Sequence, residues 1–130
     1  MTPIEKQQLA RQNDTGLVAS AIRLRAARGV AGRGQTAMAR ECGVSNTVLN
    51  NAERGLTYPN RAILQTFWRG YRIDFNFMIN GDYAQLAPDV QEALFVALAD
   101  AASEWDQREG SDRTPGGAKS VRGEKVTSRA

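Results

Sequence analysis

The chain has 130 residues, 42% of them hydrophobic, which is enough for one small domain with appendages but not for a large enzyme fold. A single cysteine excludes an internal disulfide framework and a cysteine-rich zinc site. The absence of histidine removes the usual general base and the commonest metal ligand. The composition therefore predicts a protein that is not an enzyme and that needs no metal or other cofactor.

Charge is distributed unevenly along the chain, although the net charge is only +3. Residues 22–72 carry nine arginines and two glutamates, a balance of +7, whereas residues 73–106 carry seven acids and no base, a balance of −7. A basic block attracts nucleic acid, because cationic side chains displace counterions from phosphate. Arginines used only for solubility would not gather in one block, so this pattern favours DNA as a partner.

The amino terminus is polar and lacks a hydrophobic signal segment, and the longest apolar run, residues 93–99, is too short to cross a bilayer. We therefore expect a cytoplasmic protein without a membrane partner. Thr2, Pro3 and Glu5 form the pattern of a capped helix start. This pattern predicts a short N-terminal helix or arm within residues 1–14.

A second helix is expected to follow, with Asp14 as its N-cap. Helical spacing forms an apolar stripe that would face the core, and its members are Leu17, Ala21, Leu24 and Ala31. Arg23 and Arg25 fall off this stripe. We therefore expect both arginines to remain in solvent.

The stretch from Gln35 to Gly55 predicts two short helices joined by a tight turn. Gly43 suits the left-handed conformation that reverses the chain, Ser45 suits the N-cap of the second helix, and Gly55 suits its end. Small and apolar residues recur at helical spacing on both sides of the turn: Met38, Ala39, Cys42, Val44, Leu49 and Ala52. This pattern is a helix-turn-helix.

The stretch resembles the Cro/cI-type helix-turn-helix family of phage and bacterial repressors, also called the xenobiotic-response-element family. The residues that carry the resemblance are Gln35, Ala39, Gly43, Val44, Leu49 and Glu53. The resemblance implies an all-α fold with a compact five-helix, phage-repressor-like DNA-binding domain over residues 15–82. It also implies a structural ion pair between Arg28 and Glu53, which could be bidentate and would hold the first helix of that domain against the second helix of the motif.

The second helix of the motif, residues 45–54, is expected to read base edges in the major groove of double-stranded DNA. Helix periodicity places four polar residues largely on its outer face: Asn46, Thr47, Asn50 and Asn51. The resemblance implies that the next loop lies along the sugar-phosphate backbone, and the candidate phosphate contacts are Gln35, Ser45, Arg33, Arg54, Thr57, Tyr58, Asn60 and Arg61. A merely solvated polar face is the alternative, but adjacent asparagines late in a helix have poor helix propensity.

Aromatic residues are concentrated in the region that follows this loop. They are Phe67, Trp68, Tyr71, Phe75 and Phe77. Stacking of single-stranded bases on these rings is one interpretation. Core packing is favoured, because the five residues fall on the expected inner faces of two short helices.

A last helix is predicted to open at Pro88 within residues 83–106. Its apolar stripe consists of Val90, Leu94, Leu98, Ala101 and Trp105, with Ala97 beside them, and such a stripe must be buried somewhere. Because the resembled domain is complete at about Asp82, dimerisation through this stripe is favoured, with folding back onto the same chain as a close second. Residues 107–130 are rich in Gly, Ser, Thr and charge and are expected to form a disordered basic tail.

The sequence thus predicts a sequence-specific DNA-binding transcription regulator, most simply a repressor that acts as a homodimer and is nucleoid-associated when bound to DNA. Asparagine suits adenine and the threonine methyl group suits thymine, which favours an A/T-containing half-site. An alternative is an antitoxin-like interaction module whose last helix binds a partner protein. A small nuclease is disfavoured, because no tight acidic cluster accompanies the basic block.

Overall fold

The structure is a computed structural model that describes residues 1–112, with side chains described up to Arg108. This part of the chain is all-α, as predicted, and contains no strand. Its helices are α1 (Pro3–Ala10), α2 (Leu17–Ala31), α3 (Gln35–Cys42), α4 (Asn46–Glu53), α5 (Arg61–Tyr71), α6 (Phe75–Asn80) and α7 (Pro88–Asp112). None of these helices is long and apolar enough to span a membrane.

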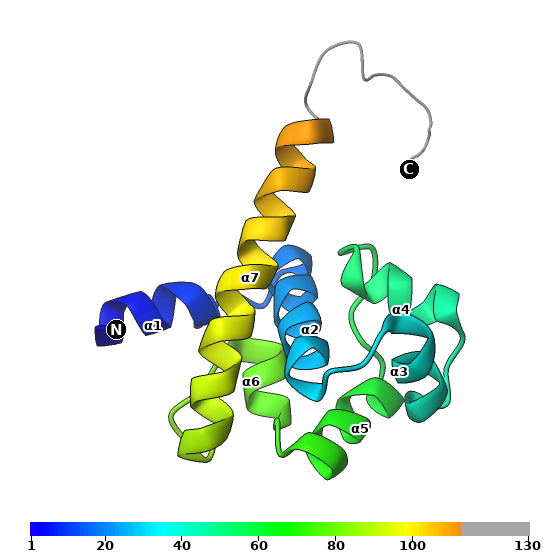
Figure 1. Cartoon of the computed structure of the whole chain (residues 1–130), viewed down its shortest axis with the longest axis horizontal. Helices are drawn as coiled ribbons and strands as arrows, with labels where there is room; N and C mark the ends of the chain where they lie inside the picture. Colours follow the sequence, from blue (N-terminus) through cyan, green and yellow to red (C-terminus); the bar gives the residue numbers. More distant parts are fainter. Residues whose placement is uncertain (113–130) are drawn as a thin grey trace.

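Helix α2 is the centre of the fold. It lies between α7 on one side and the pair formed by α3 and α4 on the other (Figure 1), and it contacts α4, α6 and α7. The core is built mainly from large side chains that are fully buried, among them Ile22, Leu24, Phe67, Phe77, Leu94 and Leu98. Burial of these apolar surfaces supplies the main driving force for folding.

Helix α1 begins as the sequence predicts. The Thr2 hydroxyl accepts a hydrogen bond from the Glu5 amide, and the Glu5 carboxylate accepts one from the Thr2 amide at 2.8 Å, which is a capping box with Pro3 at the first helical position. The helix packs against α7, and Ala10 at its end is fully buried. The N-terminal segment is therefore part of the packed domain.

The start of α2 corrects one prediction. Gly16, not Asp14, is the N-cap residue, and the Asp14 carboxylate instead accepts a hydrogen bond from the Gly16 amide at 2.9 Å. Of the predicted stripe, Ala21 and Leu24 are buried, whereas Leu17 is 36% exposed. Leu17 is the first residue of the helix, so its side chain lies at the edge of the packed surface.

The prediction that Arg23 remains in solvent was wrong. Its side chain is fully buried, where Nε donates to the carbonyl of Ala10 at 2.9 Å and Nη1 to that of Ile79 at 3.0 Å, while Nη2 donates to the carbonyls of Arg11 and Asp14. Burial lowers the pKa of Arg23 to about 10, so the guanidinium stays charged at neutral pH. A guanidinium has five donors, which allows one side chain to satisfy carbonyls at the ends of both α1 and α6.

Helix α7 folds back onto α2 and buries the stripe that was expected to form a dimer. Val90, Leu94, Leu98, Ala101 and Trp105 are between 0% and 8% exposed within a single chain. They are covered by their own domain and do not offer a surface to a second copy. Folding back, the second alternative left open by the sequence, is therefore the observed arrangement.

The ends of α7 agree only partly with the predictions. The helix opens at Pro88, as expected, but it continues to Asp112. It therefore extends past residue 106, the predicted end, into the segment that was expected to form a disordered tail. The rest of that expectation, for residues 113–130, lies outside the described residues.

Two of the five aromatic residues do not pack in the core. Phe67 and Phe77 are fully buried and Tyr71 is partly buried, but Trp68 is 52% exposed and Phe75 is 37% exposed. Trp68 follows Phe67 directly, so the helical rotation of about 100° per residue turns it away from the core. Core packing is therefore the wrong interpretation for Trp68 and Phe75.

Gly81→Ala is predicted to destabilise the fold by about 4 kcal/mol. The residue has φ +77°, and an added Cβ would lie 2.4 Å from the carbonyl oxygen of Ala10, beside Arg23. Gly32→Ala is the matched control, because Gly32 has φ +68° but open space around the added atom, and it should cost only about 1 kcal/mol. Urea unfolding of both variants measures the difference, and equal losses would contradict the steric account.

Candidate nucleic-acid interface

The predicted helix-turn-helix is present in α3 and α4. Helix α3 ends at Cys42, and Gly43 takes the left-handed conformation with φ 72°. The Ser45 hydroxyl then accepts a hydrogen bond from the Val48 amide at 3.1 Å and caps α4. Apolar side chains on the inner faces of both helices are buried: Met38, Ala39, Cys42, Leu49 and Ala52.

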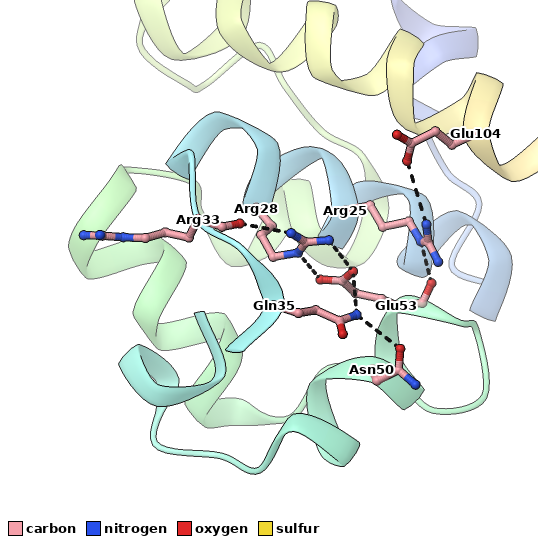
Figure 2. A network of polar contacts seen from close by, with 7 residues as sticks. All are labelled: Arg25, Arg28, Arg33, Gln35, Asn50, Glu53 and Glu104. Atoms are coloured by element: carbon pink, nitrogen blue, oxygen red, sulfur yellow. Dashed lines mark hydrogen bonds and ion pairs between the residues drawn. The ribbon is translucent and has the colours of Figure 1, made fainter. Parts of the chain in front are cut away.

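The end of α4 is held by the buried carboxylate of Glu53. Arg28 of α2 binds it in a bidentate manner, with Nε 2.6 Å from Oε2 and Nη2 2.9 Å from Oε1 (Figure 2). The Glu53 side chain is 1% exposed and that of Arg28 is 24% exposed. The hydrogen bond to Glu53 raises the pKa of Arg28 above its ordinary value. The predicted ion pair is confirmed, with the expected geometry.

Two further side chains complete this network. Gln35 Nε2 donates to Glu53 Oε1 and to Asn50 Oδ1, both at 3.2 Å, and Arg25 Nε donates to the main-chain carbonyl of Glu53 at 2.7 Å (Figure 2). Arg25 is therefore not in solvent, contrary to the prediction, and desolvation lowers its pKa. Gln35, expected at a phosphate, donates its amide hydrogens within the protein.

The outer face of α4 carries a smaller set of available side chains than predicted. Asn46 and Thr47 are exposed, and Asn51 is partly buried. The oxygen of Asn50 is engaged by Gln35, while its amide nitrogen points away from the network (Figure 2). Asn50 can thus offer its amide donors at this surface, while its carbonyl oxygen already accepts one hydrogen bond.

Val48 was overlooked by the sequence analysis, although it is 39% exposed on the same helix. It lies three residues before Asn51, so helical spacing places these two side chains on the same side of α4. The spacing of Val48 relative to Asn51 was the signal that could have identified it. The sequence analysis missed it because it considered only polar side chains on this face.

The candidate phosphate contacts fall into two groups. Arg33 is engaged, since its Nε lies 3.2 Å from Glu41 Oε1 and 3.3 Å from the Tyr71 hydroxyl. Asn60 is the N-cap of α5 and accepts a hydrogen bond from the Ile63 amide at 3.0 Å. The second group is exposed, except for the half-buried Arg54, and lies at the two ends of α4, in the segment after it and at the start of α5: Ser45, Arg54, Thr57, Tyr58 and Arg61.

Ion pairing reduces the positive charge that the basic block can offer to a partner. Of its nine arginines, Arg23 is buried and four pair with acids within the described residues, namely Arg25, Arg28, Arg33 and Arg72. Apart from the buried Arg23, four arginines of the block have no ion pair in this part of the chain: Arg40, Arg54, Arg61 and Arg69. They belong to α3, to the end of α4 and to α5.

Comparison with known proteins adds no assignment. No family model matches the chain, and neither a curated protein nor a solved structure matches it. Within residues 1–112, no group of three or more histidine, cysteine, aspartate or glutamate side chains is arranged to hold a metal ion.

Arg28→Met is predicted to lower the free energy of unfolding by about 3 kcal/mol, because it leaves the buried Glu53 carboxylate without its cation. Combining it with Glu53→Gln should cost less than the sum of the two single changes, with a coupling of about 1–3 kcal/mol. Chemical denaturation of the four proteins measures this coupling. Arg72→Met, which breaks the exposed pair with Asp89, is the control and should have no measurable effect. If the losses in free energy of unfolding for the Arg28 and Glu53 changes were additive, the stabilising role of this ion pair would be contradicted.

Proposed function

We propose that this protein is a sequence-specific regulator of transcription that binds double-stranded DNA, most simply a repressor, and that its α2–α6 unit is a phage-repressor-like domain. The observation that carries this proposal is the exposed face of α4. That helix is capped by Ser45, follows a glycine turn and is fixed at its end by buried Glu53. An α-helix fixed in this way can enter the major groove without first having to be ordered.

The chemistry of the exposed face supports an A/T-containing half-site. An asparagine side chain recognises adenine with its amide group, which donates one hydrogen bond and accepts another. Asn46 and Asn51 can supply both the donor and the acceptor. Asn50 is less available, because its oxygen already accepts a hydrogen bond from Gln35. The methyl groups of Thr47 and Val48 complement the methyl group of thymine. We therefore assign base reading to Asn46, Thr47, Val48 and Asn51.

The charges around α4 support contact with the phosphate backbone. Arg54, Thr57, Tyr58 and Arg61 lie at the end of α4 and in the segment that follows it. If all four unpaired arginines of the basic block neutralise phosphates, the salt slope of binding is about −4 per chain. This is a moderate electrostatic contribution, so base contacts must supply the preference for one sequence.

We place the interface of the proposed homodimer on a different surface from the α7 stripe that the sequence predicted. Trp68, Phe75 and Ile79 are 52%, 37% and 51% exposed on α5 and α6. Trp68 and Phe75 line a shallow hollow of about 300 Å³ together with Asp74 and Asn76. Such an apolar patch on a small protein favours an interface, and a second copy would supply the second α4 needed for a two-fold-symmetric site. The antitoxin-like alternative relied on an uncovered α7 stripe, and this stripe is buried.

Selection from a randomised duplex library at two salt concentrations tests the proposed function. Sequencing of the retained DNA should recover a two-fold-symmetric, A/T-containing motif. Retention that falls steeply with salt and shows no sequence enrichment would mean nonspecific binding. No retention would overturn the proposed function.

Asn51→Ala should relax base preference at one position of the selected site by about 1–3 kcal/mol. Arg61→Ala should instead weaken binding to all sequences alike and reduce the magnitude of the salt slope by about 1. Competition binding with selected and random duplexes separates the two effects. An equal loss on both duplexes for Asn51→Ala would refute its role in base reading.

Trp68→Arg should raise the dissociation constant of the dimer by at least about tenfold, because it places a charge in the proposed apolar interface. Ile4→Lys is the control, since Ile4 is 65% exposed on α1, a helix that contributes no residue to this patch. Sedimentation velocity over a range of concentrations measures both. An unchanged dimer in Trp68→Arg, or an equal effect of Ile4→Lys, would remove the patch from the interface.

A further inference from the structure

A groove is lined by residues of α2 and α7. Its volume of about 590 Å³ is that of a typical small-molecule site. Its apolar part is formed by Gly29 and Val30 from α2 and by Ala93, Val96 and Ala97 from α7. Its charged part consists of Arg25 and Arg28 from α2, which face Asp100 and Glu104 from α7.

Arg25 has hydrogen-bonding capacity left in this groove. Its side chain is 16% exposed, and its only hydrogen bond within the described residues runs from Nε to the Glu53 carbonyl. The closest carboxylate oxygen, Glu104 Oε1, lies 3.9 Å from Nη1, which is too far for a hydrogen bond. Arg28 differs, because Glu53 and the Arg33 carbonyl engage all three of its nitrogens.

The opposite wall carries the complementary charge. Asp100 is exposed and has no ion pair within the described residues, and Glu104 has only the long contact with Arg25. Arg28 from α2 and Arg108, whose guanidinium lies 5.4 Å from the centre of the Trp105 ring, add positive charge beside Arg25. A simple cation would be repelled by these arginines, and a simple anion at Arg25 would be repelled by the two carboxylates. A ligand that carries a negative and a positive group close together can pair with Arg25 on α2 and with the carboxylates on α7 at the same time.

We propose that this groove binds a free α-amino acid with an aliphatic side chain. The carboxylate of the amino acid accepts hydrogen bonds from the terminal nitrogens of Arg25, and its ammonium group donates to Glu104 and Asp100. The side chain of the amino acid lies on the apolar surface formed by Gly29 and Ala97. The ligand thus lies beside the long Arg25–Glu104 contact and bridges the two side chains through shorter hydrogen bonds.

The groove is connected to the end of α4. Arg25 donates to the Glu53 carbonyl, and its guanidinium lies 5.6 Å from the centre of the Trp105 ring. The Trp105 ring in turn packs at Gly55, where an added Cβ would lie 3.2 Å from Cη2. A ligand that repositions Arg25 therefore acts on the residues that end α4, and this regulatory consequence, unlike the binding itself, rests on the proposed function.

The binding is tested by titrating the ¹⁵N-labelled full chain with L-leucine and recording amide chemical shifts without DNA. L-Leucine should cause saturable shifts at Gly29, Val30 and Ala97. Two probes that each lack one charge, 4-methylpentanoate and L-leucinol, should bind at least about tenfold more weakly. No saturable shift with L-leucine, or equal binding of either analogue, would overturn the proposal.

Asp100→Asn is the decisive variant, because Asp100 is exposed and its change leaves the packing intact. It should weaken L-leucine binding by about fivefold, and Arg25→Gln should abolish it. Glu92→Gln is the matched control, since Glu92 is an exposed acid of α7 that lies outside this groove. Unchanged binding in Asp100→Asn, or an equal loss in Glu92→Gln, would also overturn the proposal.

The regulatory consequence has a separate readout. Fluorescence anisotropy of a selected duplex, with and without L-leucine, should give a changed DNA affinity that Asp100→Asn reduces. Absence of DNA binding would refute the proposed function and leave the amino-acid titration intact. DNA binding without a saturable titration would refute only the amino-acid site.

Discussion

The buried carboxylate of Glu53 is the constraint on which the placement of α4 depends. An ionised carboxylate away from water is costly unless a cation and hydrogen-bond donors surround it. Arg28 and Gln35 meet this requirement from α2 and α3. Because their donors must converge on one carboxylate, the three helices have one relative arrangement in which the charge is satisfied. The direction of the exposed face of α4 follows from that arrangement.

A second buried charge, that of Arg23, fixes the part of the fold where α1 and α6 end. The guanidinium of Arg23 gathers main-chain carbonyls from the ends of α1 and α6. Removing it would leave several buried acceptors without donors, which is costly. This requirement ties α1 to the five helices that follow it, and α7 then covers α2 along its length. The packed unit therefore extends well beyond the segment that carries the family resemblance.

Local features of the fold could be predicted from the sequence, because neighbouring residues decide them. The turn at Gly43 and the cap at Ser45 are of this kind, as is the opening of α7 at Pro88. The burial of Arg23 could not be predicted, since its hydrogen-bond partners come from segments far apart in the chain. The exposure of Trp68, by contrast, follows from its place directly after Phe67 in the same helix. An amphipathic stripe shows that α7 must be covered but not by what. In the candidate site, the Arg28–Glu53 pair came from the resemblance, whereas the Gln35–Asn50 bond required the positions of both helices.

The central claim is that the exposed face of α4 is the surface that meets DNA. Titration of the ¹⁵N-labelled chain with a short duplex of arbitrary sequence at low salt tests it most directly. The account predicts that the first amide signals to shift belong to Thr47, Val48 and Arg61, while those of Glu92 and Asp100 on α7 stay in place. Shifts confined to α7, or none at any DNA concentration, would contradict it.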